Sequence, residues 1–501
     1  MTGDLLILRN AQPGRLSDVP LLAMSEFRRQ ILEGTAEEWR VASLFARESE
    51  GQIELMVVMA NDGAGQLGLA RTRLRGDEFP SLTPDCPQVH LFEREIAEQY
   101  GVRPDGHPWL KPVRFQPPLR QGEFAFPQNG PGVTDFFRVE GEEVHEVAVG
   151  PVHAGVIEPG HFRFQCHGEM VFHLEIALGY QHRGVERALM GGPGRKTAQY
   201  IETTAGDTTI GHMLAYCHAV EALGGVRVPA RAQALRGIAL ELERLANHTG
   251  DLGALSGDVA FLPTASYCGR IRGDWLNLTA ELCGSRFGRG LVRPGGVLYD
   301  MTTAEAARLG DRVESAVHDS ADAVGLLWTT PTVTERFENT GTVSADACDQ
   351  IGMVGVAARA CGRAIDVRHD FPSGVYRFAH VPVMTAHYGD VNSRAYVRWL
   401  ELERSAEFVR EQLRSLPDTP VHAEAGALQP DSVVVSLVEG WRGEICHVAV
   451  TDGERRLARY KITDPSFHNW FGLALALREG EISDFPLCNK SFNLSYCGHD
   501  L

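Results

Sequence analysis

One short segment, residues 205–223, carries polar groups in a pattern typical of a site at the start of a helix. It opens with Gly206, Asp207 and two threonines, which are residues that can cap a helix N-terminus. His212 and Tyr216 follow four residues apart, so they lie on one face of the expected helix. An imidazole can exchange a proton near neutral pH, and a phenol can donate one. The spacing therefore predicts a helix with two proton-transferring groups on one side.

Two regions of different composition must position this helix. Residues 1–115 predict a small α/β module, with strands at 53–60 and 68–74 and a polar helix at 91–100. Residues 116–143 are rich in proline and glycine without a hydrophobic period, which is typical of a linker. Residues 144–501 open with a hairpin-like stretch and then predict mainly helices. The long ones are expected from Pro229 to about Gly250, at 304–327 and at 392–413.

The composition limits the classes of function. A chain of 501 residues with 44% hydrophobic content can bury a large core, and a net charge of -17 argues against a nucleic-acid surface. No apolar run approaches the roughly 20 residues of a membrane span, and the N-terminus lacks the order of a signal peptide. We expect a cytoplasmic protein without a transmembrane segment of its own. The tail 482–501 is aperiodic, but its large apolar side chains indicate that it packs on the protein.

The ten cysteines show no C-x-x-C spacing. Iron–sulfur and structural zinc sites usually use at least one close pair, because a short loop then presents two thiolates to one ion. Scattered cysteines are more often small buried hydrophobic residues. We expect reduced, unligated thiols and no metal bound by this chain alone.

Several short segments, which follow one another along the chain in the same order as in known families, resemble the signatures of those families. The segment Phe92–Lys111 resembles the signature of the 30 kDa subunit of respiratory complex I. The later blocks resemble the complex I 49 kDa subunit and the large subunit of energy-converting [NiFe] hydrogenases; they are residues 150–153, 158–164, 182–187 and 293–297. Both resemblances in one chain are typical of the large subunit of hydrogenase-4 and formate hydrogenlyase complexes. The resemblance implies an α+β fold: a small α/β module, then a mainly α-helical hydrogenase-like domain with peripheral β-structure.

The resemblance also locates the nickel–iron ligands of the hydrogenases, and here they are missing. That family uses two C-x-x-C pairs, since soft thiolates suit these metals. Alignment on His212 puts Ala205 and Thr208 at the first pair. Counting from Asp484 puts Ser495 and Gly498 at the second pair, with Cys497 one residue out of step. The resemblance therefore implies a relative of the hydrogenases that has lost hydrogen chemistry.

The complex I branch uses the corresponding cavity for a quinone headgroup. The resemblance places Tyr216 at the headgroup-binding tyrosine and Asp258 at a carboxylate position, with His212 beside them as a third catalytic candidate. His153 and Glu158 fall in the blocks bordering that cavity. Each has an ordinary structural alternative. Tyr216 could be a core aromatic residue, His212 could pair with a carboxylate, and Asp258 could cap the following segment. The turn around Trp441, Arg442 and Glu444 is interpreted as a connection between strands.

His182, Arg183 and Glu186 match family residues that face a cluster-bearing partner; the alternative is a surface ion-pair group. The resemblance implies partners of two kinds: a small subunit with a [4Fe-4S] cluster, and complex I-like membrane subunits, including antiporter-like proteins. The chain would then be a peripheral oxidoreductase subunit on the cytoplasmic face of the membrane, acting on a quinone or another acceptor. A working hydrogenase with atypical ligands and a purely structural subunit are the open alternatives.

Overall fold

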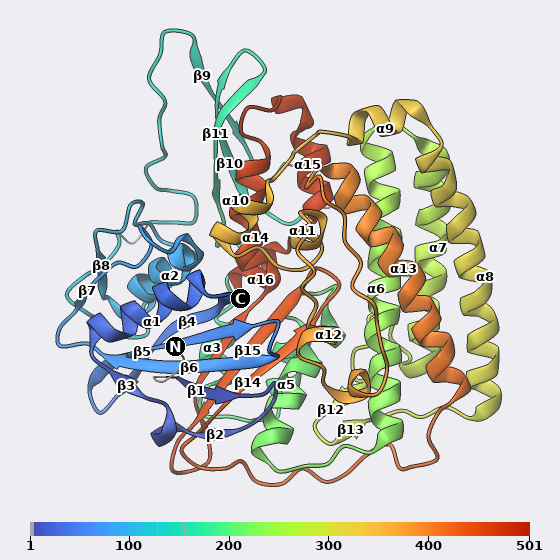
Figure 1. Cartoon of the computed structure of the whole chain (residues 1–501), viewed down its shortest axis with the longest axis horizontal. Helices are drawn as coiled ribbons and strands as arrows, with labels where there is room; N and C mark the ends of the chain where they lie inside the picture. Colours follow the sequence, from blue (N-terminus) through green and yellow to red (C-terminus); the bar gives the residue numbers. More distant parts are fainter. Residues whose placement is uncertain (1–4, 128, 154–156) are drawn as a thin grey trace.

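The computed structural model describes residues 5–127, 129–153 and 157–501 (Figure 1). The N-terminal module is built on an antiparallel sheet in the order β1-β6-β5-β4, and β3 adds to β6 in parallel. Helices α1 and α2 pack against this sheet. The bounds of the module's main elements are β1 Leu6–Leu8, β2 Gly14–Arg15, β3 Leu21–Leu22, α1 Met24–Ala36, β4 Trp39–Ser49, β5 Gln52–Asn61, β6 Gln66–Arg73, β7 Glu78–Pro80, α2 His90–Tyr100 and β8 Arg103–Asp105.

The N-terminal module and the C-terminal part of the chain share a β-sheet and a hydrophobic core. The short strand β2 pairs with β14 at the edge of a second sheet, whose order is β16-β15-β14-β2. The strands of this sheet are β14 Ser432–Glu439, β15 Glu444–Thr451 and β16 Leu457–Thr463. Side chains of β4, β5 and β6 pack with those of β14 and β15 in one buried cluster. Between Asp105 and Val144, the described residues form neither helix nor strand.

Four long helices stand side by side on the far side of this sheet (Figure 1). They are α6 Ala230–Asp258, α7 Leu262–Cys283, α8 Thr303–Trp328 and α13 Val391–Arg414. The expectation that α6 ends near Gly250 is wrong. A Cβ atom on Gly253 would lie 2.7 Å from the Cβ atom of Cys268 in α7, so the glycine allows two helices to approach closely. None of the helices in the described ranges is long and apolar enough to cross a bilayer.

The remaining elements surround the sheet and the bundle. A three-stranded arm, β11-β10-β9, extends from the top of the view in Figure 1. The C-terminal tail, residues 482–501, packs against the body, as expected, through α15 and α16. The bounds are β9 Val144–Val149, β10 His161–His167, β11 Met170–Ala177, α3 Val185–Leu189, α4 Thr197–Glu202, α5 Thr209–Leu223, β12 Val292–Arg293, β13 Gly296–Val297, α9 Pro331–Phe337, α10 Ala345–Ile351, α11 Gly355–Ala360, α12 Val367–Asp370, α14 Pro465–Ala476, α15 Phe485–Phe492 and α16 Tyr496–Asp500.

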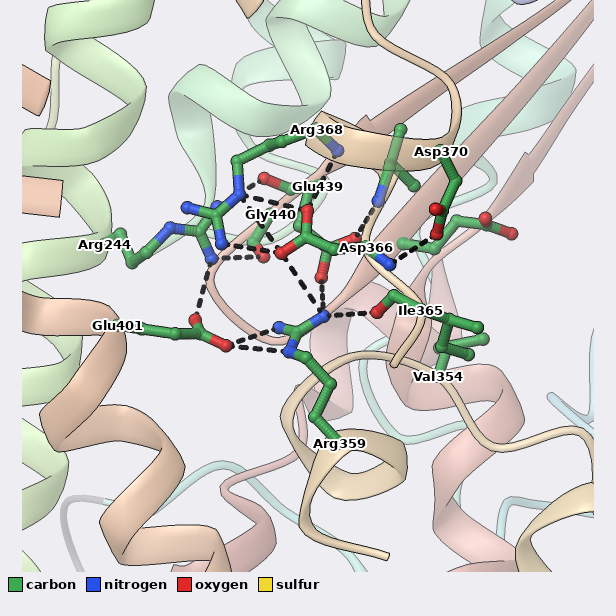
Figure 2. A network of polar contacts seen from close by, with 12 residues as sticks. Arg244, Val354, Arg359, Ile365, Asp366, Arg368, Asp370, Glu401, Glu439 and Gly440 are labelled. Carbon is green, nitrogen blue, oxygen red and sulfur yellow. Dashed lines mark hydrogen bonds and ion pairs between the residues drawn. The ribbon is translucent and has the colours of Figure 1, made fainter. Parts of the chain in front are cut away.

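A buried network of ion pairs ties the bundle to the sheet (Figure 2). Arg359 of α11 lies 2.7 Å from Glu401 of α13 and 2.8 Å from Glu439 of β14. Arg244 of α6 donates to the carbonyl oxygens of Glu439 and Gly440 at 2.7 and 3.0 Å. Buried charges are tolerated only when they are paired in this way. The network therefore fixes how α6, α11 and α13 sit on β14, next to the start of α5.

Candidate functional site

The two segments that correspond to the missing ligand pairs, residues 205–208 and 495–498, lie together in the structure. Arg183 joins them, because its Nη2 atom donates to the carbonyl oxygen of Thr204 at 2.9 Å and to that of Cys497 at 3.0 Å. Ala205, Thr208, Ser495 and Gly498 are all buried. The resemblance thus paired two segments nearly 300 residues apart, and the fold brings them to one place.

Helix α5 begins differently from the sequence expectation. Thr208 is the residue before the helix, and no local side chain caps it. Glu243 of α6 instead accepts hydrogen bonds from the backbone N–H groups of Ile210 at 2.8 Å and Gly211 at 3.2 Å. Burial raises the pKa of Glu243 to about 8, and these two N–H groups only partly oppose the shift. A carboxyl group that can be protonated near neutral pH therefore sits at the helix N-terminus.

Asp207 forms an ion pair instead of capping the helix. The Arg442 guanidinium contacts its two carboxylate oxygens at 2.6 and 2.8 Å, and the Trp441 indole N–H donates to its carbonyl oxygen at 3.0 Å. Burial alone would raise the pKa of Asp207, but Arg442 outweighs burial and the pKa is lowered. The turn between β14 and β15 is confirmed as a connection between strands. It also supplies Arg442 to the site, which the sequence did not indicate.

His212 belongs to a buried chain of hydrogen-bonded side chains that runs from Asp464, before α14, to residues of β15 and β16. Its Nε2 atom lies 3.0 Å from Asp464 Oδ2, and its Nδ1 atom lies 3.1 Å from His447 Nε2. His447 Nδ1 lies 2.9 Å from the hydroxyl oxygen of Tyr460. We call Asp464, His212, His447 and Tyr460 the relay. The alternative that His212 pairs with a carboxylate is confirmed, although its partner could not be named from sequence.

The relay can hold an additional proton without losing a hydrogen bond. Burial would raise the pKa of Asp464, but the bond from His212 outweighs it and lowers the pKa, so Asp464 is a carboxylate. A neutral His212 donates from Nε2 to Asp464 and accepts at Nδ1 from His447, which accepts from Tyr460. When His212 is protonated, it donates to both neighbours, and His447 turns its own N–H toward the Tyr460 oxygen. Tyrosine can accept as well as donate, which permits both arrangements.

Gly498 is the position that allows Asp464 to reach the tail. A Cβ atom at Gly498 would lie 2.6 Å from Asp464 Oδ2, closer than any side chain permits. Ser495 begins α16 and accepts a hydrogen bond from Gly498 N at 2.9 Å. The residues at the second missing ligand pair thus build a short helix cap and leave room for a carboxylate.

Tyr216 lies one turn after His212 and faces the same sheet. Its ring centroid is 6.1 Å from that of Tyr460, and its side chain is almost fully buried within the main core. Burial raises the pKa of Tyr216 well above its usual value. The hydroxyl group of Tyr216 therefore stays protonated at neutral pH.

Asp258 does not join this group, which corrects the expectation that it works beside Tyr216. Glu243 of α6 contacts the start of α5, so the two lie at the same height along α6. Asp258 is the last residue of α6, 15 residues after Glu243. At about 1.5 Å per residue, this is about 22 Å along the helix axis. The helices run antiparallel, since Glu221 near the end of α5 pairs with Arg236 near the start of α6. Tyr216 and Asp258 are therefore displaced in opposite directions from that level.

Glu158 and His153 lie at the tail side of the site. Glu158 accepts from Tyr496 N at 3.3 Å and is half-buried. The His153 ring packs 5.5 Å from the Phe162 ring and 6.2 Å from the Tyr496 ring, and burial lowers the pKa of His153. Both residues therefore border the tail, near Cys497, and neither contacts the relay.

The three residues expected to face a partner have different environments. Arg183 is exposed, while His182 is half-buried and its Nδ1 atom donates to the carbonyl oxygen of Asp500 at 2.8 Å. Glu186 is buried inside the chain, 2.8 Å from Arg459 and 3.2 Å from Lys461. The expectation that Glu186 faces outward is wrong, because its charge is neutralised by two cations of β16. Of the three residues, Arg183 is the most accessible to a second protein.

The residues at the site do not fit a nickel–iron centre of the thiolate type. Among the ten cysteines, Cys497 alone is half-buried near the missing ligand positions, with its Sγ atom 3.4 Å from Ser495 Oγ. Burial and the nearby Glu158 raise the pKa of its thiol to about 12, so it is not a thiolate. Within the described part of the chain, no group of three or more His, Cys, Asp or Glu side chains could hold a metal ion.

Sequence reasoning found His212 but missed Asp464, His447, Tyr460 and Arg442. One signal was present: His447 is a polar residue within an otherwise apolar strand, at 445–450. A fully buried histidine needs hydrogen-bond partners, so its position indicated a polar contact inside the core.

Comparison with known proteins gives matches along most of the chain. The profile of the respiratory-chain NADH dehydrogenase 49 kDa subunit matches residues 258–433 and 422–500, and that of the 30 kDa subunit matches residues 32–123. The carbon monoxide-induced hydrogenase of Rhodospirillum rubrum is 32% identical over 352 residues, covering 70% of this chain and 97% of the relative.

Two other relatives also belong to hydrogenase and NADH-quinone oxidoreductase complexes. Hydrogenase-4 component G of Escherichia coli (strain K12) is 29% identical over 435 residues, covering 84% of this chain and 75% of the relative. An NADH-quinone oxidoreductase subunit of Solibacter usitatus (strain Ellin6076) is 28% identical over 338 residues, covering 67% of this chain and 91% of the relative. Both halves of the resemblance found in the sequence are thereby confirmed.

Proposed function

We propose a reaction for this chain from the premise that it belongs to the family of the respiratory-chain NADH dehydrogenase 49 kDa subunit and its hydrogenase relatives, here fused to a 30 kDa-type segment. It is a complex I-like, hydrogenase-related oxidoreductase subunit. In our proposal it forms a reduction site with an iron–sulfur small subunit that carries a [4Fe-4S] cluster. The complex is bound to the cytoplasmic face of the membrane through other subunits, including antiporter-like proteins.

The observation that carries this proposal is the replacement of thiolates by a proton relay. At the place where the fold joins residues 205–208 to residues 495–498, the nearby charged and polar pairs are Asp207 with Arg442 and Asp464 with His212. The two carboxylates are hard ligands, and the one imidazole, already hydrogen-bonded at both nitrogens, cannot replace four thiolates around nickel. The site therefore favours proton-coupled reduction of an organic acceptor over hydrogen activation.

Reduction of a quinone to a hydroquinone consumes two electrons and two protons. The electrons would come from the cluster of the small subunit, because this chain has no C-x-x-C pair for a cluster of its own. The relay would supply one proton from the hydroxyl group of Tyr460, at its end, and would replace it through His447 from His212. Tyr216, whose ring centroid is 6.1 Å from that of Tyr460, would supply the second proton. Glu158 and His153 would border the acceptor on the tail side.

A purely structural role has one observation in its favour. The Arg442–Asp207 ion pair and the Ser495 cap occupy the region where a metal or an acceptor would otherwise sit. In that case the relay would hold the tail in place and no substrate would enter. A catalytic role and a structural role predict different results when the hydroxyl group of Tyr216 is removed.

The test is Tyr216→Phe in the purified complex, with Tyr267→Phe as the matched control on the exposed face of α7. If Tyr216 donates a proton, electron delivery to a quinone analogue falls by about 10²-fold, typical of losing a general acid. Assembly survives, because one hydrogen bond contributes only about 1 kcal/mol. Unchanged turnover would eliminate Tyr216 as a donor, and failure to assemble would favour the structural role.

A further inference from the structure

A cavity of about 650 Å³ lies between the module and the rest of the chain. Its lining comes from α2 and residues 107–115 on one side and from β11 and α14 on the other. Volumes of 300–1,000 Å³ are typical of small-molecule sites. Among the described residues that line it, none belongs to the relay. It is therefore a second candidate site, separate from the reduction site.

The walls of this cavity are mainly apolar and aromatic. Trp109 and Phe115 come from the module side, Phe137 from the segment after it, and Trp470 and Phe471 from α14. Trp109 and Phe137 meet edge to face, with ring centroids 6.0 Å apart. Flat aromatic walls favour a planar ligand, because stacked and edge-to-face contacts both need a ring.

One cation on the wall has no counter-ion in direct contact. Arg94 donates from Nε to the carbonyl oxygen of Lys111 and from Nη2 to that of Pro112, both at 2.9 Å. Among the described residues, no carboxylate forms an ion pair with its guanidinium. Lys111, by contrast, is neutralised by Glu175 and lies 4.1 Å above the Trp109 ring. Burial lowers the pKa of Arg94 to about 10, which still leaves it charged at neutral pH.

The histidines on the same wall are neutral and held by the backbone. His90 Nδ1 donates to the carbonyl oxygen of Pro87 at 2.9 Å, which leaves its Nε2 atom as an acceptor. His107 donates from Nε2 to the His90 carbonyl oxygen at 3.1 Å and accepts from Trp109 N at 3.1 Å. Burial lowers the pKa of both histidines to about 4. Among the described residues on this side, Arg94 is therefore the cation without a carboxylate in direct contact, and Glu175 and Glu98 act on it only from further away.

We propose that this cavity binds a planar aromatic molecule bearing one anionic oxygen group, with Arg94 as its counter-ion. The aromatic walls hold the ring, and the guanidinium forms charge-assisted hydrogen bonds to the anion. The cavity lies where the module meets β11 and α14, so both parts of the chain contribute to it. This proposal does not depend on the reaction at the relay.

The test uses the purified full-length chain and 2-naphthoate, which is measured by its displacement of the fluorescent anion 1-anilinonaphthalene-8-sulfonate. Arg94→Met should weaken naphthoate binding by about 10-fold or more, while the neutral methyl ester keeps its affinity. Arg94→Lys should recover part of the loss, which separates charge from folding. Ala474→Trp fills the cavity and should abolish binding of both compounds, whereas Ala304→Trp on the exposed side of α8 should not.

Three results would overturn the proposal. The first is equal naphthoate affinity in wild type and Arg94→Met. The second is equal affinity in Ala474→Trp and Ala304→Trp, with unchanged circular dichroism showing that both variants are folded. The third is binding by the isolated chain but not by the assembled complex, since a partner segment would then fill the cavity.

Discussion

Replacing His212 by two different residues separates the role of the relay in stability from its role in proton transfer. In His212→Leu, the Asp464 carboxylate loses its 3.0 Å partner and keeps the backbone N–H of Ser466 at 2.8 Å. Leaving a buried charge without its partner costs about 3–5 kcal/mol. In His212→Gln, the amide N–H can still donate to Asp464, and only the contact with His447 is lost. That change should cost about 1 kcal/mol.

The pH dependence of the difference has a definite sign. The folded pKa of Asp464 lies below its unfolded value of about 3.9, so the stability it contributes is present above that pH and is lost as pH falls through the folded pKa. In His212→Leu the largest opposing cause is removed, and burial raises the pKa of Asp464. The carboxyl group of the variant then becomes protonated as the pH falls from 7 to 4, so the destabilisation should be largest at neutral pH and smaller at pH 4. Urea unfolding of the purified chain at pH 7 and pH 4, followed by tryptophan fluorescence, measures this.

Turnover should fall in both variants, although only His212→Leu should lose much stability. Neither leucine nor glutamine can exchange a proton, so both variants should lose about 10²-fold or more of quinone reduction in the purified complex. Equal instability of His212→Gln and His212→Leu would contradict the role of His212 in stability, because the hydrogen bond to Asp464 would then not determine the stability. Wild-type turnover in either variant would contradict proton transfer through His212.

Three further predictions concern groups around the site. Glu243 has a folded pKa of about 8 against about 4.3 unfolded, so the stability it contributes is present below about pH 4.3 and is lost as the pH rises to 8. Between pH 5 and pH 8, Glu243→Gln should remove up to about 4 kcal/mol of the pH dependence of the unfolding free energy, measured by urea unfolding, and an unchanged dependence would refute this. Arg183→Glu should release the small subunit in a pull-down, whereas the exposed Arg195→Glu should not; equal co-purification would exclude this face. Arg359→Met should lower the unfolding free energy by about 3–5 kcal/mol and Arg336→Met at the surface by less than about 1, so similar losses would contradict the network.

The sequence predicted what depends on local periodicity and on recognisable blocks. The helices at 304–327 and 392–413 are confirmed as α8 and α13, because their apolar residues recur at helical spacing. Gly250 and Gly253 were misleading: taken alone they weaken a helix, but in α6 they are where α7 comes close. The distinction depends on a neighbour distant in sequence, and local patterns carry no such information.

The same limit applies to the site. His212 could be selected from its own helix, but its partners come from the last 60 residues, and only the packing of β15, β16 and α14 against α5 determines them. Glu186 shows the converse case. Its helical surroundings suggested an exposed ion pair, yet Arg459 and Lys461 hold it inside. Whether a charged residue faces solvent or the core is decided by tertiary contacts.

The central claim is that this chain serves a complex I-like oxidoreductase without hydrogen chemistry. The most direct test quantifies nickel in the complex purified with its small subunit and measures hydrogen–deuterium exchange on the same sample. We predict nickel far below one atom per chain and no exchange activity, while the reduced complex shows the electron paramagnetic resonance signal of a [4Fe-4S] cluster. One nickel per chain together with hydrogen–deuterium exchange would contradict the account.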